Sequence, residues 1–399
     1  FLGTTDATSL TLAVNSLAVL RFDAATDYSG RYSPNLTGGH DDNWVTSGAA
    51  GTVIGGGGNI TWPNRVTDEY GTVGGGVGNQ AGDGTADTFT AGYAAVGGGS
   101  SNRAGGSGSV VGGGFINVVT GTVGTVGGGR ENAVAGQGAT VAGGEENSAR
   151  ANWDTVGGGA LNDAYATFGV IGGGQRNTIT GRYAVVGGGH DNEVWGMAST
   201  VGGGHHNRVG GITSTVGGGE YNYVVGNGAT VAGGSHITVT GDYAAVGGGA
   251  SNWATGASAT VGGGGLNTAS GDGATVPGGV FNVAAGDGAF AAGTEARADH
   301  DGAFIWADAS GGTFTSTAVN QFAVRATGGV AFSTGGAGVA IDGQTAWHAG
   351  NDGSGSGLDA DLLDGQHASA FWNLGGNGGT SPGTHFLGTT DNQALQLHV

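Results

Sequence analysis

An apolar residue followed by a glycine-rich triplet recurs every 15 residues through most of the chain. We number the repeat from this residue as position 1; it is Val or Ile until Ala291 closes the series. Fourteen successive units without an insertion or deletion require each unit to occupy an equivalent place in a stack. The predicted core residues at position 1 are Val96, Val111, Val126, Val141, Val156, Ile171, Val186, Val201, Val216, Val231, Val246, Val261 and Val276.

Alternating side chains predict two short strands in each unit. In Ala139–Val141, the Ala and Val side chains point to one face and the Thr side chain to the other. The residue at position 7 and the apolar residue two places later, such as Asn192 and Val194, also share a face. Frequent Gly disfavours long helices by about 1 kcal/mol per residue, and it permits the positive φ angles of tight corners. We therefore expect an all-β fold, a parallel β-solenoid with one 15-residue unit per coil.

Position 7 is Asn in twelve units and differs only at Ile237 and Arg297. Two structural roles are open for these residues. Their side-chain amides could hydrogen-bond from coil to coil as a buried ladder, or each could satisfy the backbone of its own corner. The twelve residues are Asn102, Asn117, Asn132, Asn147, Asn162, Asn177, Asn192, Asn207, Asn222, Asn252, Asn267 and Asn282.

Segments outside the strict repeats predict the domain organisation. We expect an N-terminal β-hairpin cap at 1–50, β-roll repeats at 51–305 and a C-terminal β cap at 306–345. The repeats are irregular at 51–95 and strict at 96–305, and the extra residues near 63–70 and 83–90 are expected to be surface loops. Residues 346–385 are predicted to be Gly-rich linkers that carry a short helix at 358–371. Because 386–391 repeats the sequence of 1–6, residues 386–399 are expected to begin a further module of a tandem protein.

Composition excludes several classes of function. With 96 Gly and 10% charged residues among 399, a large globular core is not expected. A net charge of −19 with only 11 Lys and Arg argues against binding nucleic acid or an anionic membrane. The chain has no Cys and no apolar run of about 18 residues, so thiolate metal sites and a transmembrane helix are not expected. One thin coil buries little apolar surface per residue, so we expect several chains to pack flank to flank.

The repeats resemble the head repeats of trimeric autotransporter adhesins, whose left-handed parallel β-rolls combine an apolar residue and Gly with small polar residues and Ala. The 15-residue period and the Gly triplet depart from that family, whose repeats are usually one residue shorter. Residues 274–326 also look like tail-fibre-like repeat proteins of bacterial surfaces, and the segment 358–371 is similar to a phage tail-fibre motif, D-x-L-D-G-x-H-A-S-x-F. These resemblances imply left-handed coils, a homotrimeric fibre and display on a bacterial cell surface.

Candidate chemistry is sparse. His190 and His205 occupy the same position in successive coils, with His206 adjacent, which makes a surface metal site conceivable. Positions 5 and 6 carry mixed charged residues in other coils, which favours a solvated corner instead. The Thr column at position 15 and the scattered Trp and Tyr residues suggest β-propensity and interchain packing more than ice or sugar binding. No catalytic arrangement and no cofactor motif emerges.

These observations together predict a structural module rather than an enzyme. The expected function is a segment of an extracellular, tandemly repeated homotrimeric fibre whose main partner is itself. The alternative is an adhesin or a phage-type receptor-binding segment that contacts cell-surface or environmental glycans.

Overall fold

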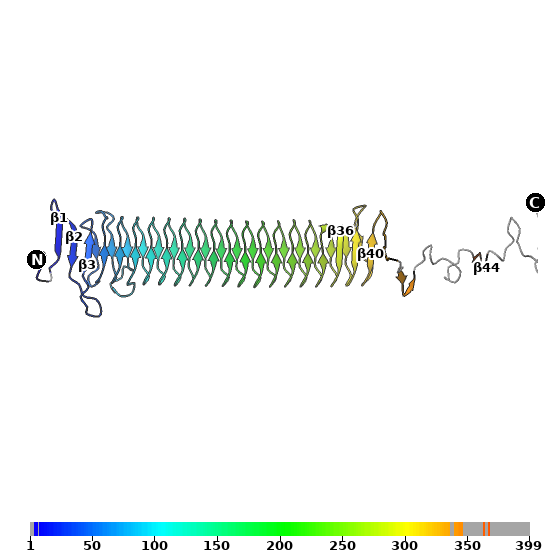
Figure 1. The fold of residues 1–399 in the computed structure, drawn as a ribbon, viewed down its shortest axis with the longest axis horizontal. Helices are drawn as coiled ribbons and strands as arrows, with labels where there is room; N and C mark the ends of the chain where they lie inside the picture. The colour runs from blue at the N-terminus through cyan, green and yellow to red at the C-terminus, as the bar shows by residue number, and fades with distance from the viewer. Residues whose placement is uncertain (1–3, 7, 336–338, 346–361, 364–365, 368–399) are drawn as a thin grey trace, which may run out of the picture. The chain divides into compact units, whose positions relative to one another are not determined.

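The computed structural model describes residues 4–6, 8–335, 339–345, 362–363 and 366–367. The chain divides into two compact units, Phe1–Thr327 and Gly328–Val399, and the first contains all the repeats. The described residues form strands and no helix. None of the described segments is a helix long and apolar enough to cross a membrane. The predicted all-β parallel solenoid with a 15-residue period is confirmed (Figure 1).

Each strict coil contributes one two-residue strand to a first sheet, formed by the residues at positions 15 and 1. Neighbouring strands are parallel and offset by one repeat, so that Thr200 pairs with Thr215 and Val201 with Val216. The strands of this sheet within the repeats are β5 (Val53–Ile54), β7 (Thr72–Val73), β9 (Ala95–Val96), β11 (Val110–Val111), β13 (Thr125–Val126), β15 (Thr140–Val141), β17 (Thr155–Val156), β19 (Val170–Ile171), β21 (Val185–Val186), β23 (Thr200–Val201), β25 (Thr215–Val216), β27 (Thr230–Val231), β29 (Ala245–Val246), β31 (Thr260–Val261) and β33 (Thr275–Val276).

A second parallel sheet consists of the residues at positions 8 and 9, so that Arg208 pairs with Tyr223. Single-residue bridges at position 5, such as that between His190 and His205, add a third line of backbone pairing. The strands of the second sheet are β4 (Trp44–Val45), β6 (Arg65–Val66), β8 (Gln80–Ala81), β10 (Arg103–Ala104), β12 (Val118–Val119), β14 (Ala133–Val134), β16 (Ser148–Ala149), β18 (Asp163–Ala164), β20 (Thr178–Ile179), β22 (Glu193–Val194), β24 (Arg208–Val209), β26 (Tyr223–Val224), β28 (Thr238–Val239), β30 (Trp253–Ala254), β32 (Thr268–Ala269), β35 (Val283–Ala284), β37 (Ala296–Ala298) and β39 (Phe314–Thr315).

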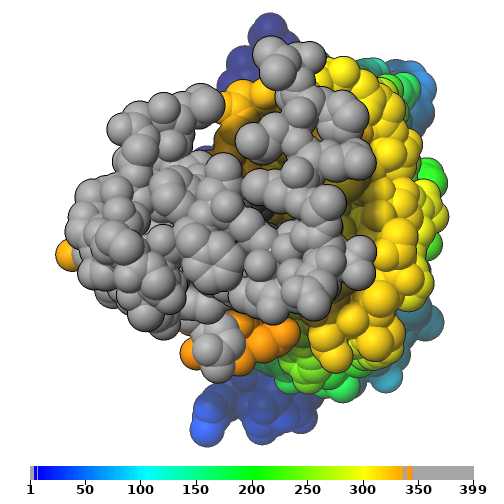
Figure 2. Space-filling view, turned by 90° about the vertical axis from the view of Figure 1, so that its right-hand side faces the viewer, coloured from blue at the N-terminus to red at the C-terminus, as the bar shows by residue number. Residues whose placement is uncertain are grey.

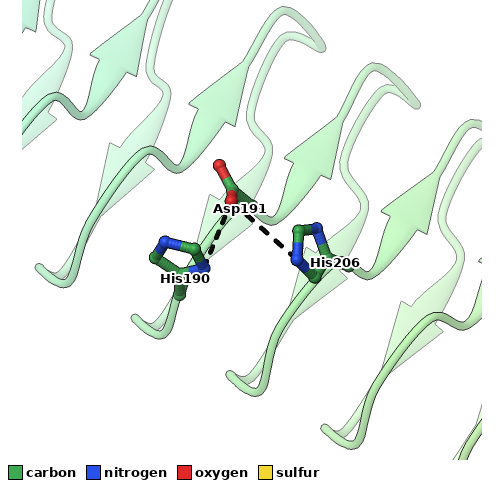
Figure 3. A group of neighbouring side chains, drawn as sticks. All are labelled: His190, Asp191 and His206. Atoms are coloured by element: carbon green, nitrogen blue, oxygen red, sulfur yellow. Dashed lines mark ion pairs between the residues drawn. The ribbon is translucent and has the colours of Figure 1, made fainter.

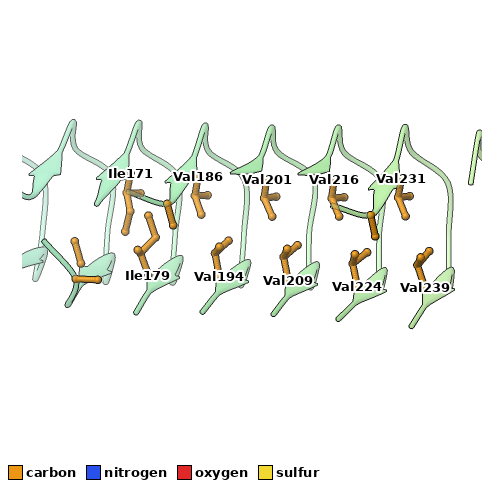
Figure 4. Packing of buried hydrophobic residues seen from close by; sticks show 14 of the residues in the cluster. Ile171, Ile179, Val186, Val194, Val201, Val209, Val216, Val224, Val231 and Val239 are labelled. Atoms are coloured by element: carbon orange, nitrogen blue, oxygen red, sulfur yellow. The ribbon is translucent and has the colours of Figure 1, made fainter. Parts of the chain in front are cut away.

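The core is a double row of side chains between the two sheets. Figure 4 shows position 1 of the first sheet facing position 9 of the second, as in Val201 and Val209. All thirteen Val and Ile residues predicted at position 1 lie in this core, with exposed fractions of at most 1%. Small residues at position 14, such as Ala229 and Ser214, fill the remaining space. Each buried Val stabilises the stack by roughly 1.5–3 kcal/mol. Every coil therefore adds its own share of this stabilisation to the core.

At one corner position of the strict coils, both the backbone angle and the available space call for glycine. The glycines at position 4 have φ angles near +90°, as in Gly204 at +86°, and a Cβ there would overlap the carbonyl oxygen of Gly219 in the next coil. Positions 6 and 13 also have positive φ angles, yet they hold non-glycine residues such as Tyr221 at +53° and Tyr183 at +60°. Those two positions face solvent and have the left-handed helical conformation that L-residues can adopt.

The solenoid begins earlier than the predicted boundary at residue 51. Strands β1 (Leu10–Val14) and β2 (Leu17–Asp23) form an antiparallel hairpin, and β2 pairs antiparallel with β3 (Asn35–Gly38). Strand β3 is already parallel to β5, with Leu36 opposite Val53. The hairpin therefore covers the N-terminal edge of the first sheet, and the first coil starts within the region expected to be the cap.

The solenoid also continues beyond its predicted end at residue 305. Strands β36 (Phe290–Thr294), β38 (Phe304–Ala307) and β40 (Phe322–Arg325) are parallel, and β34 (Gly279–Val280) also pairs with β36. The strands that we expected to form a separate C-terminal cap therefore extend the first sheet. The coil between Phe290 and Phe304 has 14 residues, and the next, to Phe322, has 18.

The end-on view in Figure 2 shows the last of these coils in yellow and orange. Green and cyan residues of earlier coils appear only at their margin, as turns stacked on one axis require. Three aromatic rings at position 15 continue this alignment, because Phe304 stacks on both Phe290 and Phe322 with ring centroids 4.4 and 4.9 Å apart.

The extra residues of the irregular units lie partly where the sequence placed them. Arg65 and Val66 are in register with Gln80 and Ala81, so the first insertion precedes Asn64 and falls at 59–63. The predicted location near 63–70 is thus wrong, because those residues have the same spacing as the corner and second strand of a strict coil. The second insertion, predicted at 83–90, does lie between β8 and β9.

The second unit is described at only a few residues. Strands β41 (Ala340–Ile341) and β42 (Gln344–Thr345) pair antiparallel, as do β43 (Leu362–Leu363) and β44 (Gln366–His367). The helix predicted at 358–371 is therefore wrong at these four residues, and the rest of that segment lies outside the described residues. Apart from these four residues, the predicted linkers at 346–385 and the repeated segment 386–399 also lie outside the described residues.

Candidate functional site

Charged and aromatic side chains concentrate at one corner of the coils between residues 175 and 223. Position 6 has a positive φ angle, +53° at Asp191 and +54° at His206, whereas the Asn that follows at position 7 is buried. Positions 5, 6 and 8 therefore project outward from consecutive coils at the strand spacing of about 4.8 Å. This corner is the candidate site.

Two histidines and one carboxylate meet at this corner, as Figure 3 shows. Oδ2 of Asp191 lies 3.2 Å from Nδ1 of His190 and 3.9 Å from Nε2 of His206. The three potential ligand atoms all lie within 4.8 Å of one another. Each side chain is partly exposed, so solvent and ions can reach the group.

The three histidines suggested by the sequence have different surroundings. His190 and His206 lie together, but Nε2 of His205 is 2.9 Å from Oε2 of Glu220. Comparing equivalent repeat positions within the chain did not identify Asp191 as the third residue of this group. The signal in the sequence was the set of positions 5 and 6 of one coil and position 6 of the next. That these three side chains lie close together can be inferred only once the coil spacing is known.

A stack of rings supports His206. The His206 ring lies 4.7 Å from the Tyr221 ring at an interplanar angle of 12°, and Tyr221 stacks in turn on His236 at 5.0 Å. All three residues occupy position 6 of successive coils. The stack therefore limits the rotation of the His206 side chain and fixes the direction of its nitrogen atoms.

An open groove of about 680 Å³ runs beside this stack, between positions 6 and 8. Its charges are balanced, since Arg176 and Arg208 accompany Asp191 and Glu193, and Nε of Arg208 lies 3.3 Å from Oε2 of Glu193. The lining residues are Arg176, Thr178, Asp191, Asn192, Glu193, His206, Arg208, Tyr221, Asn222 and Tyr223.

A second group of possible ligands, His40, Asp41 and Asp42, lies near the N-terminus of the solenoid. The backbone N–H of Asp42 donates a hydrogen bond of 3.2 Å to Nδ1 of His40. The nitrogen nearest the two carboxylates is thus already an acceptor within its own turn. This group is a less suitable metal site than the one at His190.

The twelve predicted Asn residues are buried and combine the two roles that the sequence left open. Nδ2 of Asn207 donates to the carbonyl of Gly203 in its own coil and to that of Gly219 in the next. Its Oδ1 accepts the backbone N–H of Asn222. The amides therefore close their own corners and also link successive coils.

The Asn ladder extends further toward the N-terminus than predicted. Asn64 donates its backbone N–H to Oδ1 of Asn43, and Asn79 donates to Asn64. The insertion before Asn64 concealed this register. At the other end, Ala296 rather than Arg297 takes the place of the Asn, because its N–H donates to Oδ1 of Asn282 after a 14-residue coil.

One ionisable residue, Asp154, occupies the buried small-residue column at position 14. Its carboxylate accepts hydrogen bonds from the backbone N–H groups of Ala151 and Gly169. Burial raises the pKa of Asp154 to about 6 in spite of these bonds. Gly169 follows in the same column, where a Cβ would approach Oδ1 of Asp154 to 3.3 Å, so this glycine leaves room for the carboxylate.

The outer side of the first sheet carries no charged residues in the strict coils. Between residues 96 and 289, every charged residue except the buried Asp154 lies at position 5, 6, 8, 10 or 12. We call positions 13, 15, 2 and 3 of these coils the uncharged face. It combines the Thr, Val and Ala residues of position 15 and the small residues of positions 2 and 3 with exposed aromatic rings at position 13, namely Trp153, Phe168, Tyr183 and Tyr243.

A scan of protein-family models found no match to this chain, and neither did a search of curated proteins.

Proposed function

We propose that this chain is a structural segment of an extracellular bacterial fibre, in which three copies associate through the uncharged face. The observation that carries this proposal is the segregation of charge in a chain whose net charge is −19. Copies that repel one another overall can approach along a face without charges, where no charged group loses its hydration. We propose left-handed coils, a homotrimer and display at the cell surface in line with the sequence resemblance.

The dimensions of the uncharged face suit such an assembly. Thirteen coils at about 4.8 Å span roughly 60 Å, and three residues of strand span about 10 Å. The face thus measures on the order of 600 Å², which a trimer divides between two neighbours, so the aromatic rings along its margin must add to the contact if it is to approach the roughly 800 Å² per partner of a standard interface. Exposed rings such as Trp153 and Tyr243 along one margin supply the aromatic contacts typical of interfaces.

The oligomeric state in solution tests this proposal. Light scattering during size exclusion should give about three times the chain mass of 38.2 kDa. Thr200→Glu combined with Thr230→Glu places charges on the uncharged face and should produce folded monomers. Thr178→Glu combined with Thr238→Glu makes the same change at position 8 of the second sheet and should leave the assembly intact. A wild-type monomer, or equal behaviour of the two variants, would contradict the proposal.

The groove favours a second candidate function, adhesion to glycans. Tyr223 exposes an aromatic ring beside the charged groups of Arg176 and Glu193, and sugar rings commonly stack on such a side chain while their hydroxyls bind charged groups. Binding of the chain to a glycan array, lost in Tyr223→Ala and retained in Tyr243→Ala, would support this function. Equal binding by the two variants would exclude the groove as the contact.

A further inference from the structure

We propose that His190, Asp191 and His206 bind a divalent transition-metal ion, and that Zn²⁺ is the ion best suited to them. Two imidazole nitrogens and one carboxylate oxygen are a ligand set that Zn²⁺ uses in proteins, with a water molecule as the fourth ligand. Ca²⁺ and Mg²⁺ prefer sites made of oxygen atoms alone.

The observed distances are close to those that a tetrahedral ion needs. Bonds of about 2.0–2.1 Å place tetrahedral ligand atoms roughly 3.3 Å apart. Nδ1 of His190 is already 3.2 Å from Oδ2 of Asp191, and Nε2 of His206 is 3.9 Å from the same oxygen. The two imidazole nitrogens lie within 4.8 Å of each other. Rotation of the His190 and Asp191 side chains, which the ring stack does not restrain, would bring all three atoms to one ion.

The backbone under the site is fixed by the stack. The N–H of His206 donates a hydrogen bond of 3.0 Å to the carbonyl of His190, and the N–H of Asp191 donates one of 3.0 Å to the carbonyl of Gln175. His190 also bridges to His205 in the position 5 ladder. The ligands therefore lie on rigid, regularly paired backbone, and less conformational entropy is lost when they bind an ion.

The ring stack adds a restraint on one ligand only. His206 is held against Tyr221, whose other side faces His236. His236 has the same repeat position as His206, a similar φ angle of +56° against +54°, and the same aromatic neighbour. It is not a member of the cluster, so it provides a matched control for the loss of ring stacking on Tyr221 and for the change of residue at a positive φ angle.

Calorimetric titration of the full, chelator-treated chain with Zn²⁺ tests the proposal. We expect one tight site per chain. His206→Asn and Asp191→Asn should each weaken that site by more than about tenfold, since even residues outside the ligand set cost 10–100-fold when changed. Asn tolerates the positive φ angle at both positions, and thermal melting monitored by circular dichroism will show whether each variant keeps the fold.

His236→Asn should bind Zn²⁺ as tightly as the wild type. Co²⁺ offers a second readout, because a tetrahedral site gives intense visible absorption that His206→Asn should abolish and His236→Asn should retain. Wild-type binding no tighter than that of the two ligand variants would overturn the proposal. An equal loss of affinity in His206→Asn and His236→Asn would also overturn it, because it would attribute the effect to the ring stack.

Discussion

The backbone N–H of Asn207 donates a hydrogen bond of 3.1 Å to Oδ1 of Asn192, the equivalent residue of the preceding coil. A side chain thereby takes the place that a backbone carbonyl has in the adjoining sheet ladders. The bond forms only if coils are aligned residue for residue, since a slip by one position would bring an outward-facing residue opposite the Asn. The ladder therefore fixes the register of successive coils as well as stabilising the stack.

Asn207→Ile should destabilise the solenoid by about 2–4 kcal/mol. The substitution leaves the buried N–H of Asn222 without its acceptor, and it removes the donor that Nδ2 supplies to the carbonyls of Gly203 and Gly219. Chemical denaturation would measure the loss. Thr238→Ile, which changes a side chain on the outer side of the second sheet, should have an effect below about 0.5 kcal/mol. Comparable losses in both variants would contradict a role for the ladder.

Ile237→Asn should restore the ladder where it is interrupted. The Ile237 side chain carries no acceptor for the N–H of Asn252, the next residue in this column. An Asn there supplies one, and a hydrogen bond of about 1.4 kcal/mol slows amide exchange roughly tenfold. Hydrogen exchange at Asn252 would measure the effect, with the amide of Asn192 as an internal reference. Unchanged exchange at Asn252 would count against the proposed register.

Gly204→Ala and Gly203→Ala should differ sharply although the glycines are adjacent. Gly204 has a φ angle of +86°, and a Cβ there would overlap the carbonyl oxygen of Gly219, whereas nothing lies within 4 Å of a Cβ at Gly203. We expect Gly204→Ala to cost more than about 2 kcal/mol and Gly203→Ala to change stability by less than about 1 kcal/mol. Thermal and denaturant melting of the two variants would provide the comparison.

Asp154→Ser should remove one source of pH dependence. The pKa of Asp154 is raised by burial to about 6 in the folded chain and is about 3.9 when unfolded. The folded state therefore binds more protons between pH 4 and 6, so this residue lowers stability as pH rises through that range, by roughly 3 kcal/mol in total. The difference in stability between variant and wild type should grow from pH 4 to 6 and then level off; a constant difference would contradict this.

Phe304→Ala should loosen only the C-terminal coils. The Phe304 ring joins those of Phe290 and Phe322, and each aromatic pair contributes about 0.5–1.5 kcal/mol beyond its buried area. Because coils interact chiefly with their neighbours, the loss should remain local. Hydrogen exchange should accelerate in β38 and β40 but stay unchanged near Val201. Acceleration through the whole stack would indicate cooperative unfolding instead.

The strict period made the coil, its two strands and its core predictable. Val201 and Val216 could be placed on one inner face because their spacing, neighbours and polarity are identical, and identical units must have identical environments. The same logic failed where the spacing changed. Insertions before Asn64 and a 14-residue coil before Ile305 shift the register without altering local composition, so the sequence could not locate the first and last coils.

The candidate site was less accessible to prediction. His190 and His206 were found from their types, but the partner of each histidine depends on the distance between side chains of adjacent coils. Asp191 joins the pair because its position 6 backbone has a positive φ angle, and His205 is directed to Glu220 instead. Likewise, the charge-free face became visible only once positions 13, 15, 2 and 3 were known to lie on one side of the coil.

The in-register pairing of β23 with β25 has a consequence for how such a chain can change in evolution. Because each coil presents the same backbone edge at its top and its bottom, a block of 15 residues can be duplicated or deleted without leaving a mismatch at the junction. The length of the rod then changes in steps of about 4.8 Å. Evolution can thus adjust the length of the rod one block at a time, while the surface residues of each block diverge independently.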